Sequence, residues 1–172
     1  MANAIVASML PDGVVKGDSA IKMRFGDMST RFTTDLDTAT ASDPDEYARL
    51  LGEALARGWE GFGGRVVPTE YVMRSFDVKL TYMGKSWCSV PLEVGHNEVG
   101  DADSTDWVDL ADAATLFVQV CLPAPGRAPL MPLDHQVAQK LHALTGPGNR
   151  ARDLVDLQLI AANAELNFVA TR

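Results

Sequence analysis

The chain has 172 residues, 47% of them hydrophobic and 22% charged, which is typical of one globular domain with a real core. The net charge of −8 argues against a simple nucleic-acid coat protein, and no apolar run reaches the ~18 residues of a membrane span. Residues 1–13 lack a basic region before their short apolar stretch, so we expect no secretory signal. Cys88 and Cys121 lack metal-type spacing and suit a reducing cytoplasm, where we expect the protein to reside.

Short strands and helices are expected in the first third of the chain. A β-branched run precedes Gly17, and helical apolar spacing follows it. Farther on, Asp43 suits a helix N-cap, Pro44 suits the first helical position and Gly58 suits the residue after the helix. The expected elements are a strand at 14–16, a helix at 18–25, a strand at 33–38 and a helix at 42–58.

The rest of the chain predicts more strands and then two helices. Residues 98–112 hold six acids and no base, and they predict a solvated loop or, alternatively, a docking patch for a basic partner. The other expected elements are a short strand within 61–68, a hairpin at 76–94, a strand at 115–122, a proline-rich connection at 123–132, and helices at 133–144 and 149–166. This order indicates the α+β, or mixed α/β, class, as a single compact domain with a sheet core in 1–130 and C-terminal helices in 131–172 packed on it.

Two carboxylates separated by one apolar residue distinguish the strand at 33–38. Asp35 and Asp37 flank Leu36, and a strand sends residues i and i+2 to the same face. Like charges that close repel unless a cation or a proton lies between them. Hard cations such as Mg²⁺ take oxygen ligands from one or two carboxylates and from substrate phosphates. The pair is therefore either a metal site or an acidic turn.

A third carboxylate would strengthen the metal interpretation. Glu93 lies between Leu92 and Val94 on an expected strand, so it either joins the acidic pair or simply occupies the exposed face of a half-buried strand. Asp77 competes for the role, but it begins its strand and precedes a charged residue, Lys79. We rank Glu93 above it.

The turn at Gly17 is the candidate phosphate site. A glycine between a strand and a helix N-terminus presents backbone N–H groups and the positive end of the helix dipole, although most such glycines are only turns. Bases that could meet phosphates cluster nearby and near the C-terminus: Lys16, Lys22, Arg24 and Arg31, then Lys140, Arg150 and Arg152.

The last two helices hold a further candidate group, one lysine and two aspartates. Lys140 lies beside the apolar stripe Leu133, Val137, Leu141 and Leu144, where it either snorkels to water or reaches an anion. Asp153 and Asp156 are three apart and share one helical face. A structural ion pair between the two helices is as consistent with this pattern as catalysis is.

Five segments, taken in order, resemble the AbiEii/MenT nucleotidyltransferase toxins of the DNA polymerase β-type superfamily. They are K-G-x-x-A-I-K-x-R at 16–24, R-F-T-x-D-L-D at 31–37, L-E-V at 92–94, A-x-K-L-H-A at 138–143 and R-D-L-V-D-L at 152–157. The resemblance covers residues 14 to about 160, and 31–37 and 139–157 are its most specific parts. It implies a nucleotidyltransferase fold, with a mixed sheet flanked by helices and a C-terminal helical hairpin.

The resemblance also implies a role for each matching residue. Asp35, Asp37 and Glu93 would hold Mg²⁺ or Mn²⁺, with Glu93 as a ligand or as the base toward the attacking hydroxyl. Gly17 and Ser19 would face the triphosphate. The further candidates are Lys16 and Arg31 for nucleotide binding, Lys140 as a catalytic phosphate contact, Asp153 as a catalytic residue that completes the site, and Asp156 close behind it.

The implied function is that of a toxin in a toxin–antitoxin or phage-defence system. Such a toxin transfers NMP from an NTP, often the pyrimidine CTP or UTP, to RNA, most often the tRNA 3′ acceptor end, and it is countered by a cognate antitoxin. Two departures matter: Asp18 replaces the usual second glycine or serine of the turn, and the chain is short, so we expect a minimal member. The alternatives are a degenerate, non-catalytic binding module and NMP transfer to a protein hydroxyl.

Overall fold

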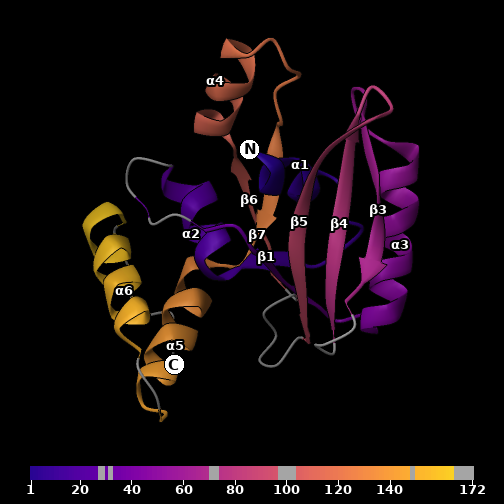
Figure 1. The fold of residues 1–172 in the computed structure, drawn as a ribbon. Helices are drawn as coiled ribbons and strands as arrows, with labels where there is room; N and C mark the ends of the chain where they lie inside the picture. The colour runs from indigo at the N-terminus through magenta and orange to yellow at the C-terminus, as the bar shows by residue number, and fades with distance from the viewer. Residues whose placement is uncertain (27–29, 31–32, 70–73, 97–103, 148–149, 165–172) are drawn as a thin grey trace.

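A mixed sheet organises the chain (Figure 1). The computed structural model describes residues 1–26, 30, 33–69, 74–96, 104–147 and 150–164, and within them the sheet has seven strands in the order β3-β4-β5-β2-β1-β7-β6. The pairs β2–β5 and β1–β7 are parallel, and the other neighbours are antiparallel. The strands are β1 Val14–Lys16, β2 Leu36–Thr40, β3 Phe62–Pro68, β4 Ser75–Tyr82, β5 Lys85–His96, β6 Asp106–Asp109 and β7 Arg127–Leu130.

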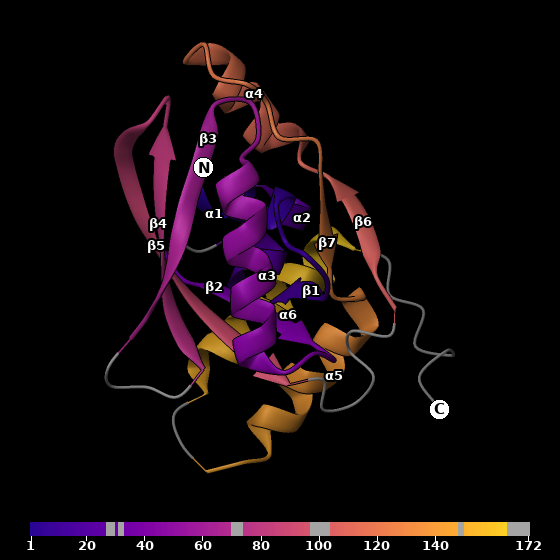
Figure 2. The ribbon, with the colours of Figure 1, turned by 90° about the vertical axis from the view of Figure 1, so that its right-hand side faces the viewer.

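Helices lie on both sides of this sheet. They are α1 Ala2–Ser8, α2 Gly17–Phe25, α3 Pro44–Arg57, α4 Ala111–Gln119, α5 Leu133–Leu144 and α6 Ala151–Asn163. Helix α3 lies lengthwise against the β3–β5 part of the sheet, whereas α2, α5 and α6 gather on the other side of the molecule (Figures 1 and 2). No helix in the described ranges is both long and apolar enough to cross a membrane.

The main core lies between the sheet and helices α1 and α3. Alternate residues of β4 and β5 are buried, and the residues between them are more exposed. Tyr47, Leu51 and Leu55 of α3 and Ile5 of α1 join this core and are fully buried. A smaller apolar cluster around Ile21, Val137 and Ile160 joins α2 to α5 and α6. The two clusters hold the start of α2 between the sheet and the C-terminal helices.

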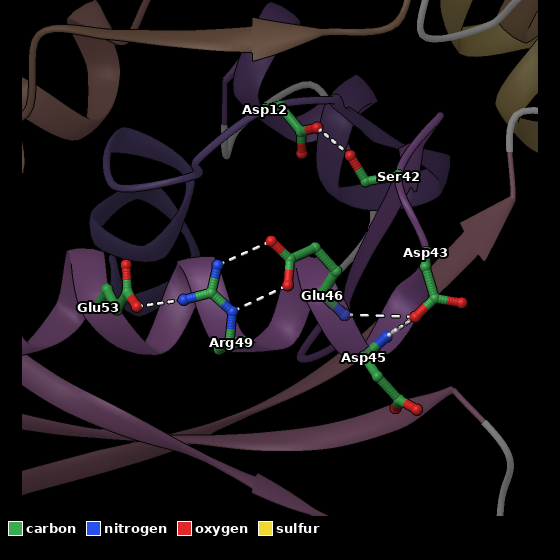
Figure 3. A network of polar contacts seen from close by, with 7 residues as sticks. All are labelled: Asp12, Ser42, Asp43, Asp45, Glu46, Arg49 and Glu53. Carbon is green, nitrogen blue, oxygen red and sulfur yellow. Dashed lines mark hydrogen bonds and ion pairs between the residues drawn. The ribbon is translucent and has the colours of Figure 1, made fainter.

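The start of α3 is defined by the predicted cap. The Asp43 side chain accepts hydrogen bonds from the backbone N–H groups of Asp45 (3.0 Å) and Glu46 (3.3 Å), so two otherwise unpaired donors are satisfied (Figure 3). On the exposed face, Arg49 bridges Glu46 and Glu53 at i−3 and i+4. Such exposed pairs contribute little stability, so the apolar face of α3 holds it on the sheet.

The predicted class, α+β or mixed α/β, is confirmed, and the helices α2, α3, α5 and α6 and the β4–β5 hairpin lie where expected. Four expectations were wrong. The strand expected at 33–38 is β2 Leu36–Thr40, so Asp35 precedes it and the alternation argued for Asp35 and Asp37 does not apply. Residues 115–122 are not a strand, because 111–119 form helix α4 with Phe117 buried. The acidic segment is not simply a loop, because it contains β6, and the proline-rich connection contains β7. Helix α1 was not expected at all.

Candidate functional site

Three charged residues from three neighbouring strands form a row on one face of the sheet. Asp37 of β2 is the register partner of Lys16 on β1 and of Glu93 on β5. The neighbours Leu36, Thr38, Leu92 and Val94 are buried, so Asp37 and Glu93 project from the opposite face to the main core. Glu93 is exposed and Asp37 is half-buried. The pairing of β2 with β5 thus brings together two carboxylates that are 56 residues apart in sequence.

The electrostatics of Asp37 are those of an acid crowded by other acids. The pKa of its carboxyl is raised to about 6, most of all by burial and next by the neighbouring charge of Glu93. Lys16 lowers the pKa, while Asp18 and Asp35 raise it further. Carboxylates that repel one another in this way favour a cation or a proton between them.

The turn at Gly17 lies directly against this carboxylate. Gly17 has φ +64°, and a Cβ built there would come within 2.4 Å of Asp37 Oδ2. Only glycine satisfies both the backbone conformation and the close approach. Gly17 begins α2, so the N-terminal, positive end of this helix lies beside Asp37. This is the geometry expected of a phosphate turn next to a metal-binding carboxylate.

Asp35 and Ser19 are joined through the backbone. The Ser19 hydroxyl donates to the carbonyl oxygen of Asp35, and the Asn3 amide donates both to that oxygen and to Ser19 Oγ, each at 3.1 Å. Ser19 is buried, so its hydroxyl holds the loop before β2. The Asp35 carboxylate is exposed and accepts from Thr34 Oγ1 at 2.8 Å.

Lys140 is the centre of an ion network. Its Nζ lies 2.6 Å from Asp156, 3.3 Å from Asp153 and 3.4 Å from Asp18, and the residue is only 7% exposed. Burial lowers the pKa of Lys140, but the hydrogen bond and charge of Asp156, with Asp18 and Asp153, outweigh it and leave the pKa raised. The network ties the first turn of α2 to α5 and α6, and it gives the Asp18 carboxylate a cationic partner.

The structural interpretation of Lys140 and the two C-terminal aspartates therefore has direct geometric support. The face of α5 that is buried consists of Gln136, Val137 and Lys140, whereas Leu141, which we had assigned to the apolar stripe, is 50% exposed. Asp77, the competitor of Glu93, lies one strand farther from Asp37 and pairs with Lys79 at 2.8 Å. Arg31 lies outside the described residues.

Two residues near the site were not anticipated. Asn3 comes from the unexpected helix α1, and nothing in its sequence context indicated a role. Gln136 of α5 donates from Nε2 to the carbonyl oxygen of Gly17 at 2.6 Å and is 1% exposed. A signal for Gln136 did exist: a polar residue four positions before Lys140, on the same helical face.

The donor set fits a hard divalent cation. Asp35, Asp37 and Glu93 supply only carboxylate oxygens, which Mg²⁺ and Mn²⁺ prefer, and Asp37 carries the raised pKa of an uncompensated acid. Within the described ranges, no three such side chains already converge on one point. In other Mg²⁺ sites one or two carboxylates act together with substrate phosphates, so full convergence without substrate is not required.

A cavity of about 400 Å³ adjoins the loop before β2. Ser19, Thr33 and Thr34 line it on the side of the acidic pair. Lys22 and Met23 of α2 and Leu116 of α4 also line it. Its volume and its mixture of polar and apolar walls fall within the range of small-molecule sites.

Solved structures similar to this chain share its fold. MenT4, a nucleotidyltransferase toxin from Mycobacterium tuberculosis H37Rv, superposes with a TM-score of 0.65 and 18% identity over 95% of this chain and 57% of its own. JHP933 from Helicobacter pylori gives 0.60 and 19%, over 94% and 63%. An antigenic nucleotidyltransferase-like protein from Paracoccidioides brasiliensis gives 0.59 and 17%, over 94% and 74%. A comparison with curated proteins gave no match.

The family model "Nucleotidyl transferase AbiEii toxin, Type IV TA system" matches residues 7–172, which include each part of the site described above except Asn3. The chain spans 57% and 63% of the lengths of MenT4 and JHP933. A match over nearly the whole chain, on a nucleotidyltransferase fold, confirms the resemblance seen in the sequence, and the chain belongs to the AbiEii family of nucleotidyltransferase toxins of type IV toxin–antitoxin systems.

Proposed function

We propose that this chain is a Mg²⁺-dependent nucleotidyltransferase that transfers NMP from an NTP to RNA, with the tRNA 3′ end as acceptor, and so blocks translation. The observation that carries the proposal is the row of Lys16, Asp37 and Glu93 beside the Gly17 turn. The row combines metal-binding carboxylates, a cation and a helix N-terminus at one place. Such a toxin acts in the cytoplasm, and a cognate antitoxin restrains it.

The reaction joins the RNA 3′-oxygen to the α-phosphorus and breaks the bond to pyrophosphate. Mg²⁺, when bound, would neutralise negative charge on the phosphate oxygens. The N–H groups at the start of α2 and the Lys16 ammonium bind and orient the triphosphate, while Asp35 and Asp37 hold the metal. Glu93, exposed beside Asp37, either completes the metal site or accepts the proton of the attacking hydroxyl.

Incubation of the protein with total RNA and each labelled NTP in turn tests this proposal. We expect label in the tRNA fraction from one nucleotide, with CTP and UTP as the first to test, and no label with Asp37→Ala. Transfer that survives Asp37→Ala would refute the proposed chemistry. A parallel incubation with a protein pool detects transfer to a protein hydroxyl instead.

A second candidate, a binding module without catalysis, is favoured by the Lys140 network. Lys140 contacts three carboxylates, and Asp18 occupies the turn where a phosphate would bind. Calorimetric titration with NTP and Mg²⁺ separates the two functions. Inhibition of growth without nucleotide binding would support the module, whereas Mg²⁺-dependent binding of one NTP supports the enzyme.

A further inference from the structure

The Lys16 side chain reaches across one strand of the sheet. Lys16 lies on β1, and β2 separates β1 from β5. A Cβ built on Gly95 of β5 would nevertheless come within 2.6 Å of Lys16 Nζ and 3.2 Å of Lys16 Cε. Gly95 pairs with Ala39 and lies two residues beyond Glu93, so both β5 residues face the same side of the sheet. The ammonium therefore lies over β5, on the face that carries Asp37 and Glu93.

Space, and not backbone conformation, accounts for the glycine at position 95. Gly95 does not have a positive φ, so its backbone can accommodate an L side chain. Glycine within a strand weakens the strand, and it often marks the close approach of another group. The atoms nearest to the missing Cβ are the Lys16 ammonium and Lys16 Cε, followed by the Thr38 carbonyl oxygen, also at 3.2 Å. The absent methyl group therefore leaves room for the Lys16 ammonium.

The charge of Lys16 acts on the acids of the site from this position. It lowers the pKa of Asp37, against burial and against three neighbouring carboxylates that raise it, Glu93, Asp18 and Asp35. An opposite charge stabilises a carboxylate mainly at short range, because the Coulomb energy falls with distance and with exposure to water. A displaced ammonium would leave these acids less well balanced, and it would also be misplaced for the phosphate oxygens of a nucleotide.

We infer that Gly95 is a positioning residue that keeps room for the Lys16 ammonium beside the Asp37 and Glu93 carboxylates. The inference rests on the proposed function, in which Lys16 binds the triphosphate. Gly95 has no side chain to offer a substrate, so it acts on the reaction only through Lys16. It follows that a methyl group at position 95 weakens transfer by moving the ammonium, and that it has no such effect once the ammonium has been removed.

A double-mutant cycle tests this dependence. We expect Gly95→Ala to lower kcat/KM for the NTP about tenfold, which corresponds to about 1.4 kcal/mol. In a Lys16→Met background, which keeps most of the apolar stem and removes the ammonium, the same change should alter kcat/KM less than about twofold. Equal effects of Gly95→Ala in the two backgrounds would overturn the inference, because they would show that the glycine acts independently of Lys16.

The matched control is Gly64→Ala on β3, whose Cβ would come within 2.5 Å of a backbone atom, the Lys79 carbonyl oxygen. It should lower the thermal midpoint more than Gly95→Ala does and leave kcat/KM unchanged, because Lys16 Nζ is the end of a flexible side chain that can turn away from a methyl group. An equal loss of kcat/KM in both variants would overturn the inference, since strain in the sheet would then explain it. If Gly95→Ala does not fold, the double variant decides: folding of Lys16→Met with Gly95→Ala supports the inference, and failure to fold contradicts it.

A second readout does not depend on nucleotide. Lys16 is half-buried, so an ammonium displaced from the sheet should react faster with acetic anhydride. Trace acetylation mapped by mass spectrometry, with the exposed Lys85 as internal reference, should show severalfold faster labelling of Lys16 in Gly95→Ala and no change in Gly64→Ala. Unchanged labelling of Lys16 in Gly95→Ala would also overturn the inference. If the starting protein neither binds nor transfers nucleotide, the proposed function fails, and the labelling alone decides whether Gly95 positions the ammonium.

Discussion

The Asp37 carboxylate lies so close to the Cα of Gly17 that a methyl group on Gly17 would overlap it, at 2.4 Å from Oδ2. The Gly17 turn and the Asp37 carboxylate are therefore packed directly against each other, with no side chain between them. Any residue other than glycine must displace either the turn or the carboxylate.

Gly17→Ala should consequently damage both stability and transfer. The positive φ alone costs about 1 kcal/mol, and the overlap with Asp37 adds to it, so we expect about 2 kcal/mol of lost unfolding free energy. NTP transfer should fall at least about a hundredfold, because the N–H groups no longer face the phosphates. Chemical denaturation and the labelled-NTP incubation measure the two effects.

The control for this prediction is Gly84→Ala in the β4–β5 turn. Gly84 has φ +74° but no atom within 4 Å of a built Cβ, so this variant has the backbone strain without the overlap. It should lose about 1 kcal/mol and keep full transfer activity. Equal losses in the two variants would show that the contact with Asp37 is unimportant.

Asp37→Asn should make the metal-free protein more stable. The folded-state pKa of Asp37 is about 6 and its ordinary value is 3.8, so the folded protein binds this proton more tightly than the unfolded chain does. The ionised carboxyl therefore destabilises the fold above pH 6, and this penalty disappears as the pH falls from 6 toward 3.8. With EDTA at pH 7.5, we expect a gain of about 1–2 kcal/mol in the variant after allowance for solvent screening, and none near pH 4.

The control for this measurement is Asp35→Asn, which also replaces a carboxylate by an amide, but at an exposed residue. Its unfolding free energy should stay within about 0.5 kcal/mol of the starting protein at both pH values. A loss of stability in Asp37→Asn at pH 7.5 would contradict the crowding of acids described above.

Added Mg²⁺ should stabilise the starting protein and not Asp37→Asn. A cation that binds only the folded state raises the free energy of unfolding with the logarithm of its concentration. Asp35, Asp37 and Glu93 are its expected ligands. Thermal midpoints measured over a series of Mg²⁺ concentrations, with EDTA to reverse the effect, give the result. An equal rise in both proteins would place the ion elsewhere.

The sequence predicted which residues could take part in the chemistry better than it predicted which of them lie together in the fold. The alternation around Glu93 indicated a strand position with buried neighbours, and the structure has Glu93 exposed and Asp37 half-buried on that face of the sheet. Their contact depends on the parallel pairing of β2 with β5, which no local pattern encodes, and only the family resemblance joined them. Gln136 shows the same limit, since its helical face was visible in the sequence but its partner, Gly17, lies 119 residues away.

Tertiary packing explains the error at residues 115–122. The run of β-branched and apolar residues suggested a strand. In the fold, Phe117 lies within helix α4, is fully buried and meets the ring of Phe62 edge-on, with 6.2 Å between the ring centroids. One anchoring side chain and the burial it gains outweigh a modest intrinsic preference for strand.

Lys140→Met should be the most destabilising of the substitutions considered. It leaves Asp156, which is 2% exposed, without its 2.6 Å partner, and breaking a buried pair in this way costs about 3–5 kcal/mol. The pKa of Lys140 is raised in the fold, so its contribution is complete below the ordinary value of 10.5 and is lost as the pH rises past the raised value. Urea denaturation at pH 7.5 and above pH 10.5 checks both statements.

The control for Lys140 is Arg49→Met, which breaks two exposed ion pairs on α3 (Figure 3). It should cost far less than Lys140→Met does, because solvent screens these charges. The double variant Lys140→Met with Asp156→Asn should recover part of the loss, since it also removes the buried negative charge that Lys140 balances. No recovery would mean that the network stabilises the fold by packing rather than by charge.

Gly52→Ala should raise stability without affecting transfer. Gly52 lies inside α3, a Cβ built there meets nothing within 4 Å, and glycine in a helix interior costs about 0.5–1 kcal/mol relative to alanine. Helix α3 packs against the core face of the sheet, opposite Asp37 and Glu93, so the site should not respond. Gly64→Ala on β3 is the opposing control, because its Cβ would come within 2.5 Å of the Lys79 carbonyl oxygen and should destabilise the strand pair. A gain at Gly52 together with a loss at Gly64, both measured by thermal unfolding, would show that the packing described around the sheet is present in solution.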